Sequence, residues 1–389
     1  MGARDRQAPD VVMVLENSTY PLDARVRMEA ETLVDSGRSV EVLAPREPGR
    51  PAHELIGGVR VSRFFLPDGQ GTLSGTALEY VVALFAITAA VLPRLVRARK
   101  GTLHVHNPPD FFFPLLRLAR LRGWSTVFDH HDDAAGMLDE KLGRATHLAS
   151  LLVWMRDRSA RAADLTITTN DTQRELVRAA ARRVVVVRNS PPVWFAHHRP
   201  SPPSGRPKLV FLGEIGAQDR VERTIDILSA LVNDRGVDSE LLIIGDGPQR
   251  RLVEERAEQL GVADRVRITG WVAFEEVPVM LASGHVGLDT APPTDVNNSS
   301  TMVKILEYLV VGLPVVASAL RETQVTGADA IVMVEEDSAE AFLAPLIELL
   351  TSADKWRRRA DRAKARGTEL LWPAQAEKLL AAYHDLDGE

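Results

Sequence analysis

The sequence predicts an α/β protein built from two doubly wound domains, and three observations lead to this prediction. The chain has 389 residues, enough for two domains of ordinary size. Short apolar runs rich in β-branched residues alternate with helical stretches, as in parallel sheets covered by helices on both faces. Near the middle, RPSPPSGRP at 199–207 has the proline, serine and glycine content of a linker.

The first predicted domain covers residues 1–198. After its first strand, a helix is expected from about Asp23 to Ser36, and Gly37 is a typical helix stop. The predicted strands of this domain are residues 10–17, 39–45, 59–67, 102–108, 125–132, 165–170 and 183–189.

The second predicted domain covers residues 208–371, and a final helix at 372–389 is expected to cross back to the first domain. Its predicted strands are residues 207–216, 239–248, 265–272, 285–292, 313–318 and 330–336. Open parallel sheets bind ligands beyond the carboxyl ends of their strands, so two such domains facing each other would form a central cleft there.

Composition excludes several classes of protein. The formal net charge of −6 argues against a nucleic-acid binder. The chain has no cysteine, which rules out a disulfide framework and a cysteine-based metal site. Its polar start lacks the apolar region of a signal peptide, so we expect a cytoplasmic protein.

One segment raises the question of a membrane. The apolar run from Tyr80 is interrupted by Pro93 and ends before Arg94, which is shorter than the roughly 20 residues of a spanning helix. We therefore expect a helix that faces the core. Peripheral contact with the inner face of a membrane is the alternative, because the basic sequence RLVRARK follows.

The stretch NNSSTMVKILEYLVVGLPVV, 297–316, is the main candidate binding site. It predicts a polar loop, a largely apolar helix, a turn and a strand. Lys304 and Glu307 lie three residues apart on one side of this helix. The helix N-terminus favours a phosphate, which Lys304 would complement, while Glu307 could accept from a ribose diol. The alternative is that Lys304 and Glu307 only form an ion pair with each other on a partly exposed helix.

These motifs resemble a known family. STMVKILEYLVVGLPVVAS followed by RET is similar to the nucleotide-sugar motif of the retaining glycosyltransferases of the GT-B fold, family-4 group. LLIIGDGPQRRLVEERAEQLGVADRVRITGWV resembles the preceding segment in that group. YPLDARVRMEAETLVDSGRSVEVL, HVHNPPDFFFPLL and VFDHHDD resemble N-terminal segments of one subgroup. The resemblance covers nearly the whole chain in the same order.

The resemblance implies two Rossmann-like domains, with the nucleoside-diphosphate sugar on the second and the acceptor on the first. It places Glu307 on the ribose, Lys304 on the diphosphate, and the backbone at Gly270 and Trp271 near the base. The full set of expected donor-binding residues is Gly213, Gly216, Arg220, Gly245, Gly270, Trp271, Ser299, Ser300, Thr301, Lys304 and Glu307. The turn at Gly245 is expected mainly to shape the sheet edge.

Some positions depart from the family pattern. Ser299 replaces the first of two glutamates, while Glu214 and Asp219 stand near the usual basic pair of the phosphate loop. Arg220 replaces a glycine that is common in the subgroup. Lys304 and Arg220, with Arg25 from the first domain, are the remaining candidates to balance the diphosphate charge.

Histidines mark the predicted acceptor side. His131 aligns with the cleft histidine of the family, and the expected catalytic residues are His131, Lys304 and Glu307. Acceptor binding is assigned to Asn17, Arg25, His106, Asn107, His130 and Asp132. His104 and His106 share one strand face and could bind a metal, but no third ligand is evident, so no metal is assigned.

The sequence thus predicts a cytoplasmic enzyme that transfers a hexose-type sugar from a nucleoside diphosphate to a hydroxyl acceptor with retention, without a cofactor or obligatory metal. A small molecule, a glycan or a lipid-linked sugar could be the acceptor, in envelope polysaccharide or specialised-metabolite synthesis. The alternatives are a sugar-nucleotide epimerase, a phosphorylase, or a non-catalytic binder of nucleotide sugars. The sequence leaves the oligomeric state open.

Overall fold

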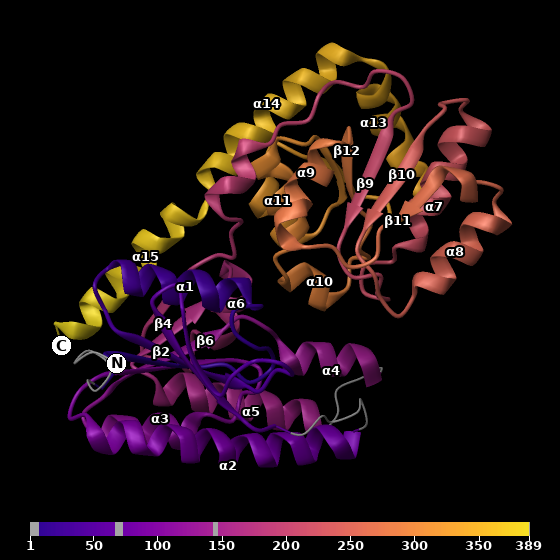
Figure 1. The fold of residues 1–389 in the computed structure, drawn as a ribbon. Coiled ribbons are helices and arrows are strands. Elements are labelled where there is room, and N and C mark those ends of the chain that lie inside the picture. The colour runs from indigo at the N-terminus through magenta and orange to yellow at the C-terminus, as the bar shows by residue number, and fades with distance from the viewer. Residues whose placement is uncertain (1–7, 67–72, 143–146, 389) are drawn as a thin grey trace. The chain divides into compact units, whose positions relative to one another are not determined.

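The computed structural model describes residues 8–66, 73–142 and 147–388 (Figure 1). The chain forms two compact units. The first contains Met1–Arg188 together with Gln375–Glu389, and the second contains Asn189–Ala374. The division falls before the predicted linker at 199–207, because the side chain of Phe195 is fully buried in the core of the second unit.

The first unit contains an eight-stranded sheet in the order β3-β4-β2-β1-β5-β6-β7-β8. All neighbouring strands are parallel except β3 and β4, which form an antiparallel edge. The strands are β1 (Val11–Val14), β2 (Val40–Pro45), β3 (His53–Ile56), β4 (Val59–Phe64), β5 (Thr102–His106), β6 (Ser125–His130), β7 (Leu165–Thr168) and β8 (Val184–Val186).

Helices cover both faces of this sheet. Figure 1 shows α1 and α6 on one face and α2, α3 and α5 on the other. The helices are α1 (Ala24–Asp35), α2 (Leu73–Arg97), α3 (Phe113–Leu121), α4 (Ala134–Leu142), α5 (His147–Ala162) and α6 (Asp171–Val177). The unit is completed by the C-terminal part of α15 (Trp372–Asp387).

The second unit contains a six-stranded parallel sheet in the order β11-β10-β9-β12-β13-β14. Its strands are β9 (Lys208–Leu212), β10 (Glu240–Ile244), β11 (Val266–Ile268), β12 (Val286–Asp289), β13 (Val315–Ser318) and β14 (Val332–Val334). Its helices are α7 (Glu222–Ser229), α8 (Arg250–Gln259), α9 (Val277–Ala282), α10 (Asp295–Ser299), α11 (Val303–Val311), α12 (Arg321–Gly327), α13 (Ala339–Thr351) and α14 (Ala353–Glu369).

Strand β9 shows why the second sheet is covered on both faces. Successive side chains of a strand point to opposite faces. Leu209 and Phe211 accordingly pack in the core beneath α7 and α13, whereas Val210 and Leu212 pack in the core beneath α9 and α11. The predicted fold class, two doubly wound α/β domains, is confirmed.

Local sequence signals fix the helices that carry the candidate site. Asp23 caps α1, its side chain accepting from the amide of Val26. Helix α11 ends at Gly312, which has the left-handed conformation (φ +86°) that glycine adopts without a steric penalty. Both helices therefore begin and end close to the positions expected from the sequence.

Helix α2 is longer than the sequence predicted. It continues through Pro93, and its segment Tyr80–Arg97 has the length and apolar character of a membrane span, with a mean hydropathy of 1.7. Only 22% of that segment is buried. One side of the helix packs in the core of the first unit, as expected, while the opposite side is exposed.

Candidate active site

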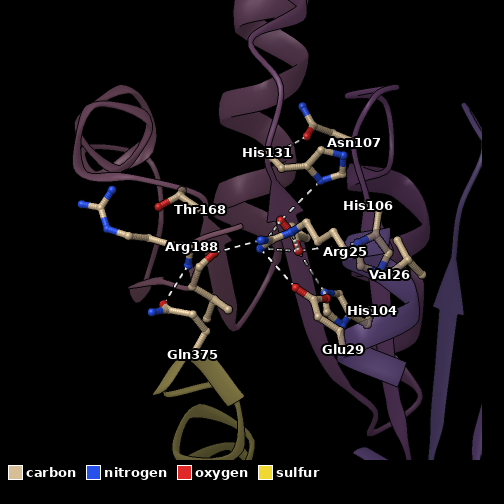
Figure 2. A network of polar contacts seen from close by, with 12 residues as sticks. Arg25, Val26, Glu29, His104, His106, Asn107, His131, Thr168, Arg188 and Gln375 are labelled. Carbon is tan, nitrogen blue, oxygen red and sulfur yellow. Dashed lines mark hydrogen bonds and ion pairs between the residues drawn. The ribbon is translucent and has the colours of Figure 1, made fainter. Parts of the chain in front are cut away.

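A buried arginine–carboxylate pair lies at the carboxyl ends of β5 and β6 (Figure 2). Arg25 of α1 donates from Nε to Oδ2 of Asp129 (2.9 Å) and from Nη2 to Oδ1 (3.2 Å). It also donates to the carbonyl of Val187 (2.9 Å) and lies 3.1 Å from Oε1 of Glu29. Burial would raise the pKa of Asp129, but Arg25 and the nearby histidines hold it well below its usual range. Asp129 is therefore ionised.

His131 lies beside this carboxylate. Its Nδ1 is 3.5 Å from Oδ1 of Asp129, and the ring is almost fully buried. Burial alone would lower the pKa of His131, but its interactions with Asp129 and Asp132 outweigh burial, so the pKa is raised. The raised pKa favours the protonated ring, in which both nitrogens are donors, so Nε2 can donate while Nδ1 faces Asp129. His131 can therefore donate a hydrogen bond or a proton.

Asn107 holds the turn that carries His131. Its Oδ1 accepts from the amides of His131 (2.7 Å) and Asp132 (3.2 Å), and its Nδ2 donates to the carbonyl of Asp132 (2.7 Å) and to Asp110 (3.0 Å). The side chain is fully buried. These bonds give Asn107 a positioning role, while its contact with an acceptor stays a prediction.

His130 and His106 are also buried, which does not support their predicted contact with an acceptor. His130 has its Nδ1 3.0 Å from Nδ2 of Asn107, and burial lowers its pKa to about 3. His106 stacks on His104 with ring centroids 4.3 Å apart. Of the other predicted acceptor residues, Asn17 is exposed and Asp132 is partly exposed.

The structure brings together four side chains that could hold a metal: Glu29, His104, His106 and Asp129. Each offers one ligand atom, and these atoms lie within 4.8 Å of one another. The sequence had not identified a third ligand for the two histidines. However, the Arg25 guanidinium pairs with both carboxylates. The chain itself thus supplies a cation to this group.

Protonation also balances the charge of this group. Burial raises the pKa of Glu29 well above its usual range, and it lowers the pKa of both His104 and His106. Burial thus favours the neutral forms of Glu29 and of both histidines, and Arg25 and Asp129 are the charged pair. This arrangement is compatible with a buried polar network that orients His131.

In the second unit, Lys304 lies among carboxylates. Its Nζ contacts Oδ1 of Asp219 and lies 3.9 Å from Oδ1 of Asp289. It also lies over the ring of Phe211, 4.5 Å from the centroid. Within the described residues, these are the ion pairs of Lys304, so the alternative of a surface pair with Glu307 is wrong.

Glu307 lies one turn further along α11 and is nearly buried. Burial raises the pKa of Glu307 to about 8, although nearby Lys304 lowers it in part. In the part of the chain that the structure describes, no hydrogen bond or ion pair within 4.0 Å engages this carboxyl. A carboxyl group in this condition can accept from a pair of ligand hydroxyls.

Glycines shape the backbone next to Lys304. Gly213 and Gly245 follow β9 and β10 with φ of +142° and +141°. A Cβ on Gly245 would lie 2.0 Å from the carbonyl oxygen of Gly213, so only glycine fits there. A Cβ on Gly213 would lie 3.4 Å from Cε of Lys304. This agrees with the expected structural role of Gly245.

The other predicted donor-binding positions have different surroundings. Gly216 is partly exposed, and a Cβ there would meet no atom within 4 Å. Gly270 (φ +71°) pairs with Gly245 in an isolated bridge. Trp271 follows with its side chain 75% exposed. The exposed indole leaves room for a base to stack on it.

The hydroxyl residues before α11 do not cap it. The N-cap position is Met302, which has no capping side chain, and Thr301 precedes it. Ser299 and Ser300 instead donate their hydroxyls to the carbonyl of Val296 (2.9 and 2.8 Å), closing the end of α10. Of the two roles open to these hydroxyls, capping α11 or donating to phosphate oxygens, the structure excludes the capping by Ser299 and Ser300.

Arg220 adopts the left-handed conformation (φ +50°), which glycine adopts more easily than arginine. Its guanidinium pairs with Asp337 (2.9 Å), as does that of Arg223. Lys304 is therefore better placed than Arg220 to balance the charge of a diphosphate.

The sequence reasoning missed Asp219 and Asp289 as the partners of Lys304. Asp219 follows β9 and Asp289 ends β12, and a carboxylate beyond the end of a parallel strand was the signal that could have identified both.

Comparison with known proteins covers both units. The family profile described as "Glycosyl transferase 4-like domain" matches residues 22–190, and the profile described as "Glycosyl transferases group 1" matches residues 206–352. The two matched ranges fall one in each half of the chain.

Two enzymes show similarity in sequence. An α-D-kanosaminyltransferase of Streptomyces kanamyceticus is 29% identical over 47% of this chain. A GDP-mannose-dependent α-(1-6)-phosphatidylinositol dimannoside mannosyltransferase of Mycobacterium tuberculosis is 30% identical over 44% of this chain. The matched stretches span 45% and 42% of the length of these relatives, respectively.

A solved structure is similar over nearly the whole fold. The sucrose-phosphate synthase of Thermosynechococcus elongatus superposes with a TM-score of 0.72 at 16% identity, covering 97% of this chain and 99% of that one. At this identity the likeness supports the GT-B fold. The two profile matches, which together cover most of the chain, show that it belongs to the group 1 glycosyltransferases.

Proposed function

We propose that this protein is a retaining glycosyltransferase that moves a hexose-type sugar from a nucleoside diphosphate to a hydroxyl acceptor. The observation that carries the proposal is the pair Lys304 and Glu307, both buried on one side of α11, with Lys304 beside Gly213 in the turn that follows β9. A lysine suits a diphosphate and a carboxyl group suits a ribose diol, so together they fit one nucleoside diphosphate.

On the donor side, the lysine supplies the main chemistry. Negative charge grows on the leaving diphosphate as the sugar–oxygen bond breaks, and a fixed cation stabilises that charge most in the transition state. Lys304 now contacts Asp219, so a bound diphosphate would take over part of this contact. The departing phosphate can accept the acceptor proton, so the mechanism needs no strong protein base.

On the acceptor side, the histidine supplies a donor. The carboxylate neighbours of His131 raise its pKa against the effect of burial, which favours the protonated form of the ring. Such a ring can bind a hydroxyl of the transferred sugar or of the acceptor. Asp129 fixes its orientation and Asn107 fixes its backbone.

The names of the relatives guide the choice of substrates. By its name, one relative transfers a kanosaminyl group, and the other depends on GDP-mannose and is a mannosyltransferase for a phosphatidylinositol dimannoside. We therefore propose a nucleoside-diphosphate hexose or aminohexose as donor, and a sugar-like or lipid-linked polyol as acceptor.

The cytoplasm is the proposed location, since a chain without cysteine lacks a disulfide framework. Fractionation of cells that produce the protein tests the location.

The test begins with thermal shift against UDP, GDP, ADP, CMP and dTDP, because a ligand that binds the folded state raises its stability. Sugar release and transfer are then measured with the sugar nucleotides of the preferred base, in the presence of EDTA. Stabilisation followed by transfer supports the proposal. Binding without hydrolysis or transfer would instead favour the non-catalytic binder, and conversion of the bound sugar to its epimer would favour the epimerase.

A further inference from the structure

Helix α2 has two apolar sides. The side that packs on the sheet consists of Ala83, Ile87, Val91 and Leu95, each four residues after the last. The opposite, exposed side carries Val81, Phe85, Leu92 and Val96, and Phe85 is 71% exposed. A surface helix normally keeps polar residues on its outer side, so this second apolar side requires an explanation.

The exposed apolar surface extends beyond α2. Tyr80 contacts Phe111 edge to face, with ring centroids 5.9 Å apart, and Phe113 contacts Trp154 of α5 in the same way at 5.4 Å. Trp154 is exposed, as is Leu151 on the same helix. Figure 1 shows α2, α3 and α5 on the same face of the sheet, so their exposed apolar side chains belong to one side of the first unit, here called the apolar surface.

Basic residues border this surface. Arg97, Arg99 and Lys100 are exposed at and just beyond the end of α2. Arg117 lies over the ring of Phe113 and Arg158 over that of Trp154, at 5.8 and 5.1 Å from the centroids. Between Tyr80 and Lys100 the sequence has no acidic residue, although the chain as a whole carries a net charge of −6.

We propose that this face of the first unit docks on an anionic lipid surface. The apolar side chains of α2 and the Trp154 ring would enter the boundary between headgroups and acyl chains, and the surrounding arginines would contact lipid phosphates. Indole and phenol rings suit that boundary because they are apolar with one polar atom. The helix lies on the membrane and does not cross it, since its other side belongs to the protein core. This inference does not depend on the transferase activity.

Flotation of the full chain with lipid vesicles tests it. We expect binding to vesicles of phosphatidylcholine with phosphatidylglycerol, and binding at least about tenfold weaker to phosphatidylcholine alone. Raising the salt from about 50 to about 500 mM should weaken binding, because salt screens exposed charges. The double variant Phe85→Glu with Leu92→Glu should reduce binding about tenfold or more. The double variant Arg97→Gln with Arg99→Gln should weaken binding to the anionic vesicles but leave binding to phosphatidylcholine vesicles unchanged.

Leu55→Glu is the matched control. Leu55 is exposed to a similar degree as Phe85 but lies on β3. This variant should bind vesicles like the wild type, and all three variants should keep the wild-type melting temperature and nucleotide binding. Failure of the wild-type chain to bind anionic vesicles overturns the proposal. An equal loss of vesicle binding in the Leu55→Glu variant also overturns it. The proposal likewise fails if the wild-type chain is a dimer that does not bind vesicles and that Phe85→Glu with Leu92→Glu converts to a monomer.

Discussion

Arg25 and Asp129, 104 residues apart in the chain, form a two-point ion pair at 2.9 and 3.2 Å in which neither side chain is exposed by more than 6%. Removing one partner of such a pair leaves a buried charge uncompensated.

Arg25→Met should lower the free energy of unfolding by about 3–5 kcal/mol, because Asp129 is left buried and ionised. Urea unfolding measures it. The control is Arg38→Met, which breaks a pair with Asp387 that is partly exposed and should cost less than about 1 kcal/mol. Adding Asp129→Leu to Arg25→Met should restore part of the stability. Equal effects of the two single variants would contradict the importance of burial here.

His131→Ala should reduce turnover about 10²-fold while leaving nucleotide affinity unchanged, because a positioned polar group is lost from the acceptor side. Steady-state transfer and calorimetry with the nucleoside diphosphate measure the two effects. His53→Ala, at an exposed site on β3, is the control and should change neither. His130→Ala should mainly reduce stability, since that ring is buried beside Asn107. Normal transfer by His131→Ala would remove it from the site.

Glu307 should make nucleotide binding depend on pH. Its pKa of about 8 in the folded protein means that at pH 7 the group is mostly protonated, whereas a ribose diol binds best to the carboxylate. Affinity for the nucleoside diphosphate should therefore rise as pH increases from about 7 to about 9, by up to about tenfold per pH unit below the pKa. Calorimetry at several pH values measures this rise.

Glu307→Gln is the control for that experiment, because its affinity should stay constant over the same range. The sign for stability is opposite to that for affinity. A carboxyl whose pKa is raised on folding binds a proton in the native state that the unfolded chain has released. The unliganded protein should therefore lose stability as pH rises from about 4.5 to about 8. The same pH dependence in Glu307→Gln would assign the effect to another group.

Lys304→Met should weaken binding of the nucleoside diphosphate more than binding of the nucleoside, because the ammonium meets the phosphates. Asp219→Asn should have the opposite effect and raise diphosphate affinity by about two- to tenfold, since the carboxylate competes for the same ammonium. Asp226→Asn, which removes a surface partner of Arg256, is the control. If Lys304→Met weakens both ligands equally, the lysine supports the helix rather than the phosphate.

Gly245→Ala should lower the free energy of unfolding by more than about 3 kcal/mol, since a Cβ at φ +141° would lie 2.0 Å from the carbonyl oxygen of Gly213. Thermal and urea unfolding measure this loss. Gly261→Ala provides the comparison, because that glycine also has positive φ (+68°) but open space around it. It should cost only about 1 kcal/mol. Similar losses would mean that backbone strain, and not the close approach, limits position 245.

Much of the fold could be predicted because periodicity and stop signals are local. The β-branched runs marked the central strands, and Gly37 and Gly312 marked helix ends. The edge strand β3 was missed, since HELI is short and partly polar. The apolar run of α2 was judged too short because Pro93 and Arg94 marked its end, whereas the helix continues through both. Sequence alone also does not show which of its apolar sides faces solvent.

The candidate site was only partly predictable, because side-chain partners come from distant parts of the chain. Residue types at strand ends suggested Lys304, Glu307 and His131. Nothing local indicated that Ser299 and Ser300 would bond back to Val296 instead of capping α11. Their hydroxyls could satisfy either helix end, and only the three-dimensional path of the loop decides which.

The return of residues 375–389 to the first unit determines how that unit could be produced as a separate fragment. The hydroxyl of Tyr383 lies 2.8 Å from Nδ1 of His104, and Leu379 and Tyr383 are fully buried. A fragment that stops at residue 188 would expose this apolar surface and leave the imidazole of His104 without its tyrosine. The first unit is therefore discontinuous in sequence. To produce it alone, residue 188 must be connected to residue 375 by a short peptide linker.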